Sequence, residues 1–143
     1  MKKVFIDSSV LVAASASKNG ASALILGLCR KERIKGFVSL DVIKEAQKNV
    51  NLKLGPLEKE RLTYYLKKAN LYLLPDPEVE SIYECEAVIK KKDAPVLAAG
   101  LKSPASFLIT LDRKHFLTKK VIAFVKPMKI LTPGDFLKTL KVF

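Results

Sequence analysis

The chain has 143 residues, 49% of them hydrophobic, and its 26 Lys and Arg against 14 Asp and Glu give a net charge of +12. This length and composition are typical of one globular domain with a full core, and they exclude a disordered chain. The positive charge favours a polyanionic partner such as nucleic acid, although a lysine-rich surface that only keeps the protein soluble is the alternative. No apolar run approaches the roughly 18–20 residues that span a bilayer, so we expect no membrane partner.

The first residues do not predict a secretion signal. Their apolar run, residues 4–6, ends at Asp7, whereas a signal needs about 7–15 apolar residues. We therefore expect a cytoplasmic protein. The two cysteines, Cys29 and Cys85, fit no metal-ligand spacing and are expected to be buried and inert.

Short apolar runs alternate with helical patterns along the chain, and neither a repeat nor a linker interrupts them, so we expect a single domain over residues 1–143. Strands are predicted at residues 4–6, 37–38, 71–74, 107–109 and 130–131. Helices are predicted at residues 21–33, 40–50, 57–69, 78–91, 94–100 and 134–141, with shorter turns at 10–14 and 113–117 and an ambiguous stretch at 121–125. This alternation predicts an α/β fold with a parallel sheet between helices.

Several details of these elements follow from single residues. Gly36 is expected to end the helix at 21–33, and Ser39 is expected to cap the helix at 40–50. The apolar residues of the helices at 57–69 and 78–91 are expected to face the core, with a dimer surface as the alternative.

Acidic residues accompany the apolar elements of this basic chain. Asp7 and Asp112 each follow a strand, Asp93 precedes the helix at 94–100, and Glu45 lies at the flank of the inner face of the helix at 40–50. The carboxyl ends of parallel strands gather at one edge of a sheet, and clustered carboxylates there need a compensating cation. Mg²⁺ or Mn²⁺ would supply it and would activate water against a phosphodiester. Each acid alone also has a simpler explanation as a turn, helix-cap or solvent-exposed acid, so these patterns leave the cluster open.

The order of these short motifs resembles the PIN domain, a family that includes the VapC-type toxins of toxin–antitoxin pairs. The resemblance covers residues 3 to about 140, and the matching stretches are Phe5–Ser9, Ser39–Glu45, Asp93–Ala99 and Leu108–Asp112. It implies a three-layer α/β/α sandwich with a central five-stranded parallel sheet. It also implies a metal-dependent endoribonuclease that acts on single-stranded RNA, an antitoxin protein as a possible partner, and a homodimer.

Position by position, the resemblance assigns the catalytic and metal-binding roles to four acids, which are Asp7, Glu45, Asp93 and Asp112. Ser9 and Thr110 take the places of the polar residues that support the first and fourth acids. Many relatives carry a further acid two places after the fourth, and here that place is Lys114. The implied cofactor is Mg²⁺ or Mn²⁺, with one or two ions.

Basic residues near the acids in sequence are candidates for substrate binding. Arg113, Lys114 and Lys92 are suited to bind RNA phosphates, although solvation alone is the alternative. His115 is the only histidine. We expect it to dock the short helical turn or to face solvent, rather than to act in general acid–base catalysis.

Our leading hypothesis from the sequence is a metal-dependent ribonuclease of the toxin type. A nuclease of the same fold that processes or repairs RNA without an antitoxin is an alternative, and so is a nucleic-acid-binding module with a vestigial site. A phosphoacceptor signalling domain has a similar sheet but needs paired acids after the first strand, and here Ser8 follows Asp7.

Overall fold

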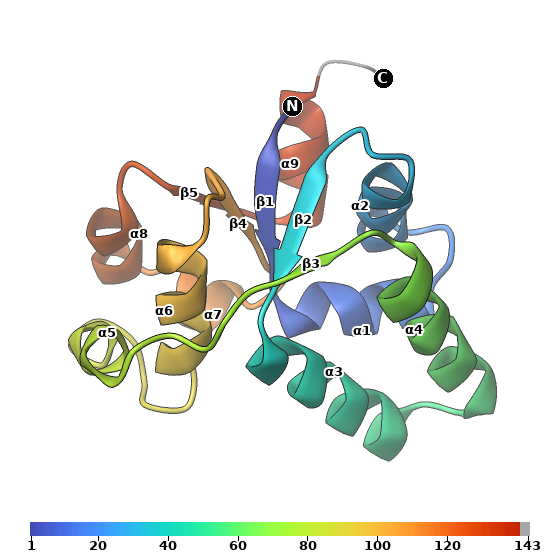
Figure 1. Ribbon diagram of the computed structural model, residues 1–143, viewed down its shortest axis with the longest axis horizontal. Helices are drawn as coiled ribbons and strands as arrows, with labels where there is room; N and C mark the ends of the chain where they lie inside the picture. The colour runs from blue at the N-terminus through green and yellow to red at the C-terminus, as the bar shows by residue number, and fades with distance from the viewer. Residues whose placement is uncertain (141–143) are drawn as a thin grey trace.

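The computed structural model describes residues 1–140, which form five strands and nine helices, with two helices after each of the first four strands and one after the fifth (Figure 1). The strands are β1 (Lys3–Ile6), β2 (Lys35–Val38), β3 (Tyr72–Leu73), β4 (Phe107–Ile109) and β5 (Lys129–Leu131). The helices are α1 (Ser8–Ala16), α2 (Ala21–Arg30), α3 (Leu40–Lys53), α4 (Pro56–Lys68), α5 (Val79–Cys85), α6 (Ala94–Lys102), α7 (Arg113–Phe116), α8 (Lys119–Val125) and α9 (Pro133–Thr139). The predicted α/β/α architecture with a five-stranded parallel sheet is confirmed.

The sheet has the strand order β3-β2-β1-β4-β5, with every pair parallel. Its central strand β1 is buried on both faces, which explains its unbroken apolar run. The chain moves outward from β1 to β2 and β3, and it then crosses to the other side of β1 to form β4 and β5. In open parallel sheets, such a reversal leaves a crevice at the carboxyl ends of the central strands, where ligands bind.

Helix α6 packs close against this central part of the sheet. A Cβ atom on Gly100 would come within 3.1 Å of Leu108 Cδ1 and 3.3 Å of Phe5 Cδ2, so the glycine permits the close approach. Six of the nine residues of α6 are buried, in line with its apolar sequence. This packing fixes the start of α6, and Asp93 just before it, next to the sheet.

The prediction for the region around Gly36 is wrong. Helix α2 ends at Arg30, the chain turns through Glu32 at a φ of 57°, and Gly36 lies inside β2. A Cβ atom at Gly36 would come within 2.8 Å of Cys29 Sγ. The glycine therefore allows neighbouring side chains to approach the strand, rather than ending a helix.

The apolar residues of α4 and α5 do not all face the core as predicted. Leu57 is 60% exposed, Val79 76% and Tyr83 77%. Helix α5 is also shorter than the expected 78–91, and its main packing partner is α6. Because this contact involves one side of the helix, apolar residues on its other sides remain exposed.

Other details of the prediction can be compared directly. The Ser39 hydroxyl accepts the Val42 N–H at 3.2 Å, which confirms the cap of α3, and both cysteines are buried and free. The stretch at 121–125 belongs to a helix, α8, and the strand at 71–74 is only two residues long. The predicted helix at 134–141 corresponds to α9, with residue 141 outside the described part of the chain.

Within residues 1–140, no single helix is both long and apolar enough to cross a bilayer. Helices α1 and α2 meet the criteria of length and composition only when taken together, and the pair is bent by 103°.

Candidate metal centre

Asp7 lies directly after β1 and is only 5% exposed. Its backbone N–H donates to the Ile109 carbonyl at 3.1 Å, which continues the pairing of β1 with β4 and brings Asp7 beside Thr110. The hydroxyls of Thr110 and Ser9 both donate to Asp7 Oδ2, at 2.7 and 2.8 Å. The two polar residues expected to support the site therefore hold the first acid directly.

Asp112 follows β4 and caps the short helix α7. Its backbone N–H donates to Thr110 Oγ1 at 3.0 Å, and its Oδ1 accepts the backbone N–H of His115 at 3.2 Å. The ring nitrogen Nδ1 of His115 lies 3.0 Å from Asp112 Oδ1 and 2.9 Å from Oδ2. The same imidazole nitrogen therefore contacts both oxygens of the fourth acid.

Asp93 lies before α6 and is 7% exposed. Its side chain makes no capping hydrogen bond to α6, so helix capping does not explain this acid. Its Oδ2 is buried without any hydrogen-bond partner. A buried polar atom left without a partner costs roughly 1–3 kcal/mol, and more when it is charged, so a bound cation would satisfy it.

Glu45 reaches the same place from α3, where it is partly buried. Asn49 and Lys53 follow it at intervals of four residues, which places all three side chains on one side of the helix. The three residues line a pocket of about 290 Å³ together with Asp7, Asp93 and Asp112. Four acids that are remote in sequence thus meet in one pocket at the reversal of strand order.

Burial raises the pKa of two of these acids. It raises the pKa of Asp7 above 3.8, and the Thr110 and Ser9 hydroxyls with nearby backbone N–H groups offset part of the rise. Burial also raises the pKa of Glu45, where Asp7 and Asp93 add to the rise, and the Ser8 hydroxyl and Lys92 oppose it. Ionising these carboxyls together is therefore unfavourable unless a cation is bound beside them.

The donor set fits a divalent ion. Asp93, Asp112 and His115 each offer one ligand atom, and these atoms lie within 4.8 Å of one another. Carboxylate oxygens are the ligands that Mg²⁺ and Mn²⁺ prefer, and the imidazole nitrogen suits a transition metal more than Mg²⁺. Asp93, whose Oδ2 is buried and unpartnered, belongs to this group.

The basic candidates lie around the pocket rather than inside it. Lys92, Arg113 and Lys114 are exposed, and Lys92 is close enough to influence Glu45. Arg113 lines a second hollow of about 420 Å³, which shares the residue Ala13 with the acidic pocket and also includes Lys138.

Sequence reasoning missed two polar residues that line the pocket. Asn49 and Lys53 line the pocket, and their spacing from Glu45 along one helix is the signal that would have found them. His115 does dock the short helical turn as expected, but it does so through the carboxylate of a candidate metal ligand. Its position three residues after Asp112 is the corresponding signal.

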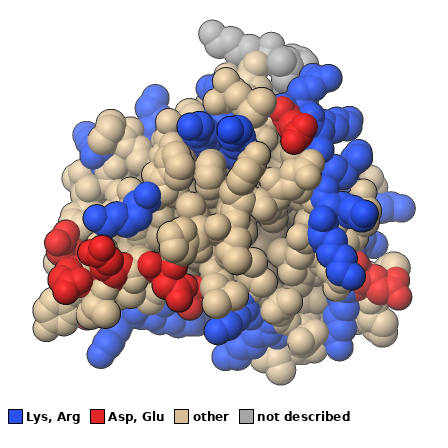
Figure 2. Space-filling view, viewed as in Figure 1, with Lys and Arg blue, Asp and Glu red and all other residues tan. Residues whose placement is uncertain are grey.

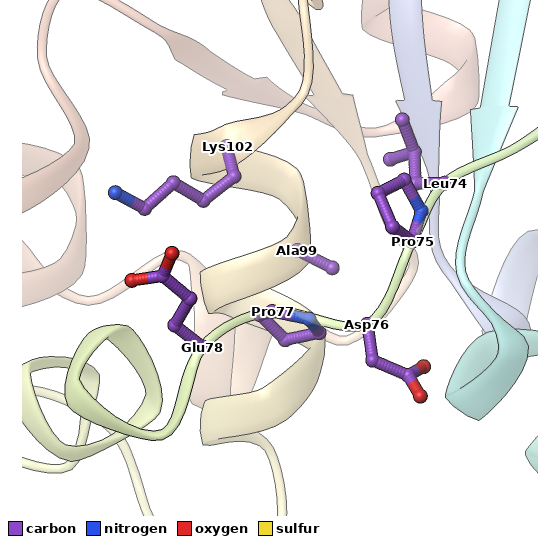
Figure 3. Close-up of a pocket in the computed structure, with 7 residues that line it drawn as sticks. All are labelled: Leu74, Pro75, Asp76, Pro77, Glu78, Ala99 and Lys102. Carbon is purple, nitrogen blue, oxygen red and sulfur yellow. The ribbon is translucent and has the colours of Figure 1, made fainter.

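A different cavity, of about 210 Å³, lies between the segment before α5 and helix α6 (Figure 3). Figure 3 shows its two acids, Asp76 and Glu78, pointing to opposite sides, with Lys102 as the nearby base. The residues that line it offer no third metal-ligating side chain. This cavity therefore fits a metal ion less well than the acidic pocket does.

Comparison with known proteins identifies related folds. A family model described as "PIN domain" matches residues 3–114, a stretch that contains all four acids. PAE2754 from Pyrobaculum aerophilum is similar at 18% identity and a TM-score of 0.63, over 99% of this chain and 97% of that one. VapBC2 from Rickettsia felis, whose structure was solved with a DNA fragment from the VapBC2 promoter, is similar at 18% identity and a TM-score of 0.65. The similarity covers 90% of this chain and 96% of that one. No curated protein matched the chain.

Proposed function

The chain belongs to the PIN-domain family, whose members are generally nucleases, and from this premise we propose that it is a metal-dependent endoribonuclease that hydrolyses phosphodiester bonds in single-stranded RNA. The observation that carries the proposal is the buried, unpartnered Oδ2 of Asp93 in a pocket with three other acids. An arrangement of this kind is costly for the fold alone and useful once a divalent ion is bound.

The four acids take distinct parts in this mechanism. When bound, Mg²⁺ or Mn²⁺ supplies charge for the scissile phosphate and lowers the pKa of water. Asp7, Asp93 and Asp112 would hold the ion, with Asp7 kept in place by the Ser9 and Thr110 hydroxyls. Glu45 would complete the ligand set or accept a proton from the attacking water, because it lines the same pocket as the other three acids and is only partly buried.

The surroundings of the pocket support a nucleic-acid substrate. The net charge of +12 favours binding to phosphates, and Figure 2 shows Lys and Arg along the right and lower edges of the molecule in that view. The hollow that adjoins the acidic pocket at Ala13 carries Arg113 and Lys138. We propose that a single strand runs from the acids into this hollow, with Arg113, Lys114 and Lys92 binding its phosphates.

We further propose that the protein, as a single domain of 143 residues, is the toxin of a toxin–antitoxin pair and forms a homodimer. The similar fold of VapBC2 supports an antitoxin partner. Expression of the chain should arrest growth, and co-expression of the protein encoded by a neighbouring gene should relieve the arrest. Metal-dependent RNA cleavage without growth arrest would instead favour an RNA-processing nuclease that has no antitoxin.

The enzymatic part is tested with labelled single-stranded RNA in Mn²⁺ or Mg²⁺, with and without EDTA. Cleavage should require the ion and should be lost in Asp7→Asn. Asp41→Asn is the matched control, because Asp41 lies in the first turn of α3 but is exposed. Undiminished cleavage by Asp7→Asn would contradict the mechanism, and RNA binding without metal-dependent turnover would favour a binding module.

A further inference from the structure

The imidazole of His115 contacts the Asp112 carboxylate more extensively than helix capping requires. The cap of α7 is already made by the backbone N–H of His115, which donates to Asp112 Oδ1 at 3.2 Å. The ring Nδ1 adds contacts to Oδ1 at 3.0 Å and to Oδ2 at 2.9 Å, an oxygen that the cap does not use. Because an ionised carboxylate can only accept, Nδ1 carries the hydrogen in this contact.

We propose that His115 is a positioning residue of the metal centre, which fixes the Asp112 carboxylate through Nδ1 and thereby sets the affinity of the site for a divalent ion. The inference rests on the proposed function, since it concerns the same pocket. It adds to that function a residue that lies outside the four acids.

The four acids differ in how they are held, and this difference explains why Asp112 needs such a partner. Asp7 is buried and receives two hydroxyl hydrogen bonds, whereas Asp112 has a side chain that is 31% exposed. A partly exposed carboxylate has freedom of rotation that a buried one lacks. The imidazole restricts this rotation and holds the Asp112 oxygens within reach of Asp93.

The proximity of all three side chains gives the expected size of the effect. Carboxylate oxygens of Asp93 and Asp112 and a ring nitrogen of His115 lie within 4.8 Å of one another, so removing the imidazole frees the Asp112 carboxylate at the site itself. Partners that orient metal ligands typically contribute about 10–100-fold to metal affinity. We expect a loss in this range when the imidazole is removed.

The test measures Mn²⁺ affinity by electron paramagnetic resonance, using untagged protein so that His115 is its only imidazole. His115→Ala should weaken binding about 10–100-fold. His115→Asn places an amide nitrogen near the position of Nδ1 and should restore most of the affinity. His115→Gln places its amide nearer the position of Nε2 and should not restore it. Tyr83→Ala, which removes an exposed ring on α5, is the control and should bind Mn²⁺ as the wild type does.

A second measurement follows the single imidazole by ¹⁵N nuclear magnetic resonance, without metal and with diamagnetic Mg²⁺. The Nδ1–H signal should be present in both states, because the hydrogen bond to Asp112 is retained when the ion binds. Loss of that signal on addition of Mg²⁺ would show that Nδ1 binds the ion, which overturns the positioning role.

The outcomes separate this proposal from the proposed function. Equal Mn²⁺ affinity in the wild type and all three His115 variants would overturn only the role of His115. A wild-type protein that binds no Mn²⁺ would overturn the metal-dependent function and, with it, the positioning role. Because His115→Asn and His115→Gln are both polar amides, their difference remains informative even where His115→Ala folds poorly.

Discussion

Two groups of acidic residues in this molecule differ in almost every physical respect. The first group lines the pocket at the end of β1 and β4, and it comprises Asp7, Glu45, Asp93 and Asp112. The second group lies between residues 76 and 86, and it comprises Asp76, Glu78, Glu80, Glu84 and Glu86. Figure 2 shows acids gathered at the left of the molecule, over α5. The second group is the larger, but only the first has the character of a metal centre.

The difference between the groups lies in burial and in hydrogen bonding. Asp7 and Asp93 are 5% and 7% exposed, and Asp93 Oδ2 has no partner. The acids around α5 are exposed, apart from Glu86, which is partly buried. Water solvates exposed carboxylates, so their mutual repulsion is weak and needs no bound ion. A dense group of acids in a sequence is therefore a poorer indication of a metal site than single acids at the ends of buried strands.

The largest expected effect is on RNA cleavage, which should depend on the acids of the first group and not on those of the second. Asp93→Asn removes the charge of the acid that has the unpartnered oxygen, and we expect RNA cleavage to fall by more than about 100-fold, since even residues that only orient metal ligands contribute about 10–100-fold. Glu84→Gln makes the same kind of change on α5 and should leave the rate unchanged. Initial rates on a labelled single strand in Mn²⁺ measure both variants. Similar losses of cleavage rate in Asp93→Asn and Glu84→Gln would contradict the assignment of the metal centre to the first group alone.

The second effect concerns thermal stability in the presence of the ion. At a Mn²⁺ concentration about 100 times the dissociation constant, binding stabilises the native state by about 2.7 kcal/mol, which corresponds to a rise in Tm of about 5–10 °C. Differential scanning fluorimetry should show this rise in the wild type and in Glu80→Gln. Asp7→Asn should show a much smaller rise. An equal rise in all three proteins would place the ion outside the pocket.

The third effect is the pH dependence of stability in EDTA. The pKa of Asp7 is raised by burial, so between its unfolded value near 3.8 and its higher folded value the native state binds more protons than the unfolded state. The free energy of unfolding therefore falls as the pH rises through this window, because of Asp7. Relative to the wild type, Asp7→Asn should therefore become more stable as the pH rises above about 4, as measured by urea unfolding.

The matched control for this pH effect is Glu80→Gln, which removes an exposed carboxyl. Its stability relative to the wild type should change little over the same range. If Asp7→Asn instead loses stability relative to the wild type as the pH rises, the sign of the burial argument is wrong. Glu45→Gln should follow Asp7→Asn in direction, because burial and the neighbouring Asp7 raise the pKa of Glu45.

The sequence predicted the parts of this molecule that depend on local order. The acids after β1 and β4 were found because an apolar strand that ends in an acid fixes where its side chain lies relative to the sheet. Apolar periodicity also located most helices. It could not show which faces another element covers, so Val79 and Tyr83 were assigned to the core and are exposed. Gly36 was misassigned because its role depends on Cys29, a contact between different elements.

The site residues that were missed have the same physical explanation. Asn49 and Lys53 are polar residues on a helix, and sequence alone leaves most such residues in solvent. Their importance depends on the direction in which α3 presents them, and this is set by its packing against α1, α4 and α6. The four acids were recognised as one group only through the resemblance to a family, since periodicity did not determine that they would meet.

The smallest effect extends the comparison to substrate binding. Arg113 lies in the hollow beside the acidic pocket, whereas Lys102 lines the cavity near Asp76 and Glu78. RNA binding is measured in the Asp7→Asn background, which prevents cleavage, at several salt concentrations. Loss of one phosphate contact on a single strand should reduce the slope of log affinity against log salt by about 0.7. We expect this reduction, with binding a few-fold weaker, for Arg113→Ala and not for Lys102→Ala. A larger loss of RNA affinity for Lys102→Ala than for Arg113→Ala would indicate that RNA binds near Asp76 and Glu78. That result would contradict the proposed path, because these acids would repel its phosphates.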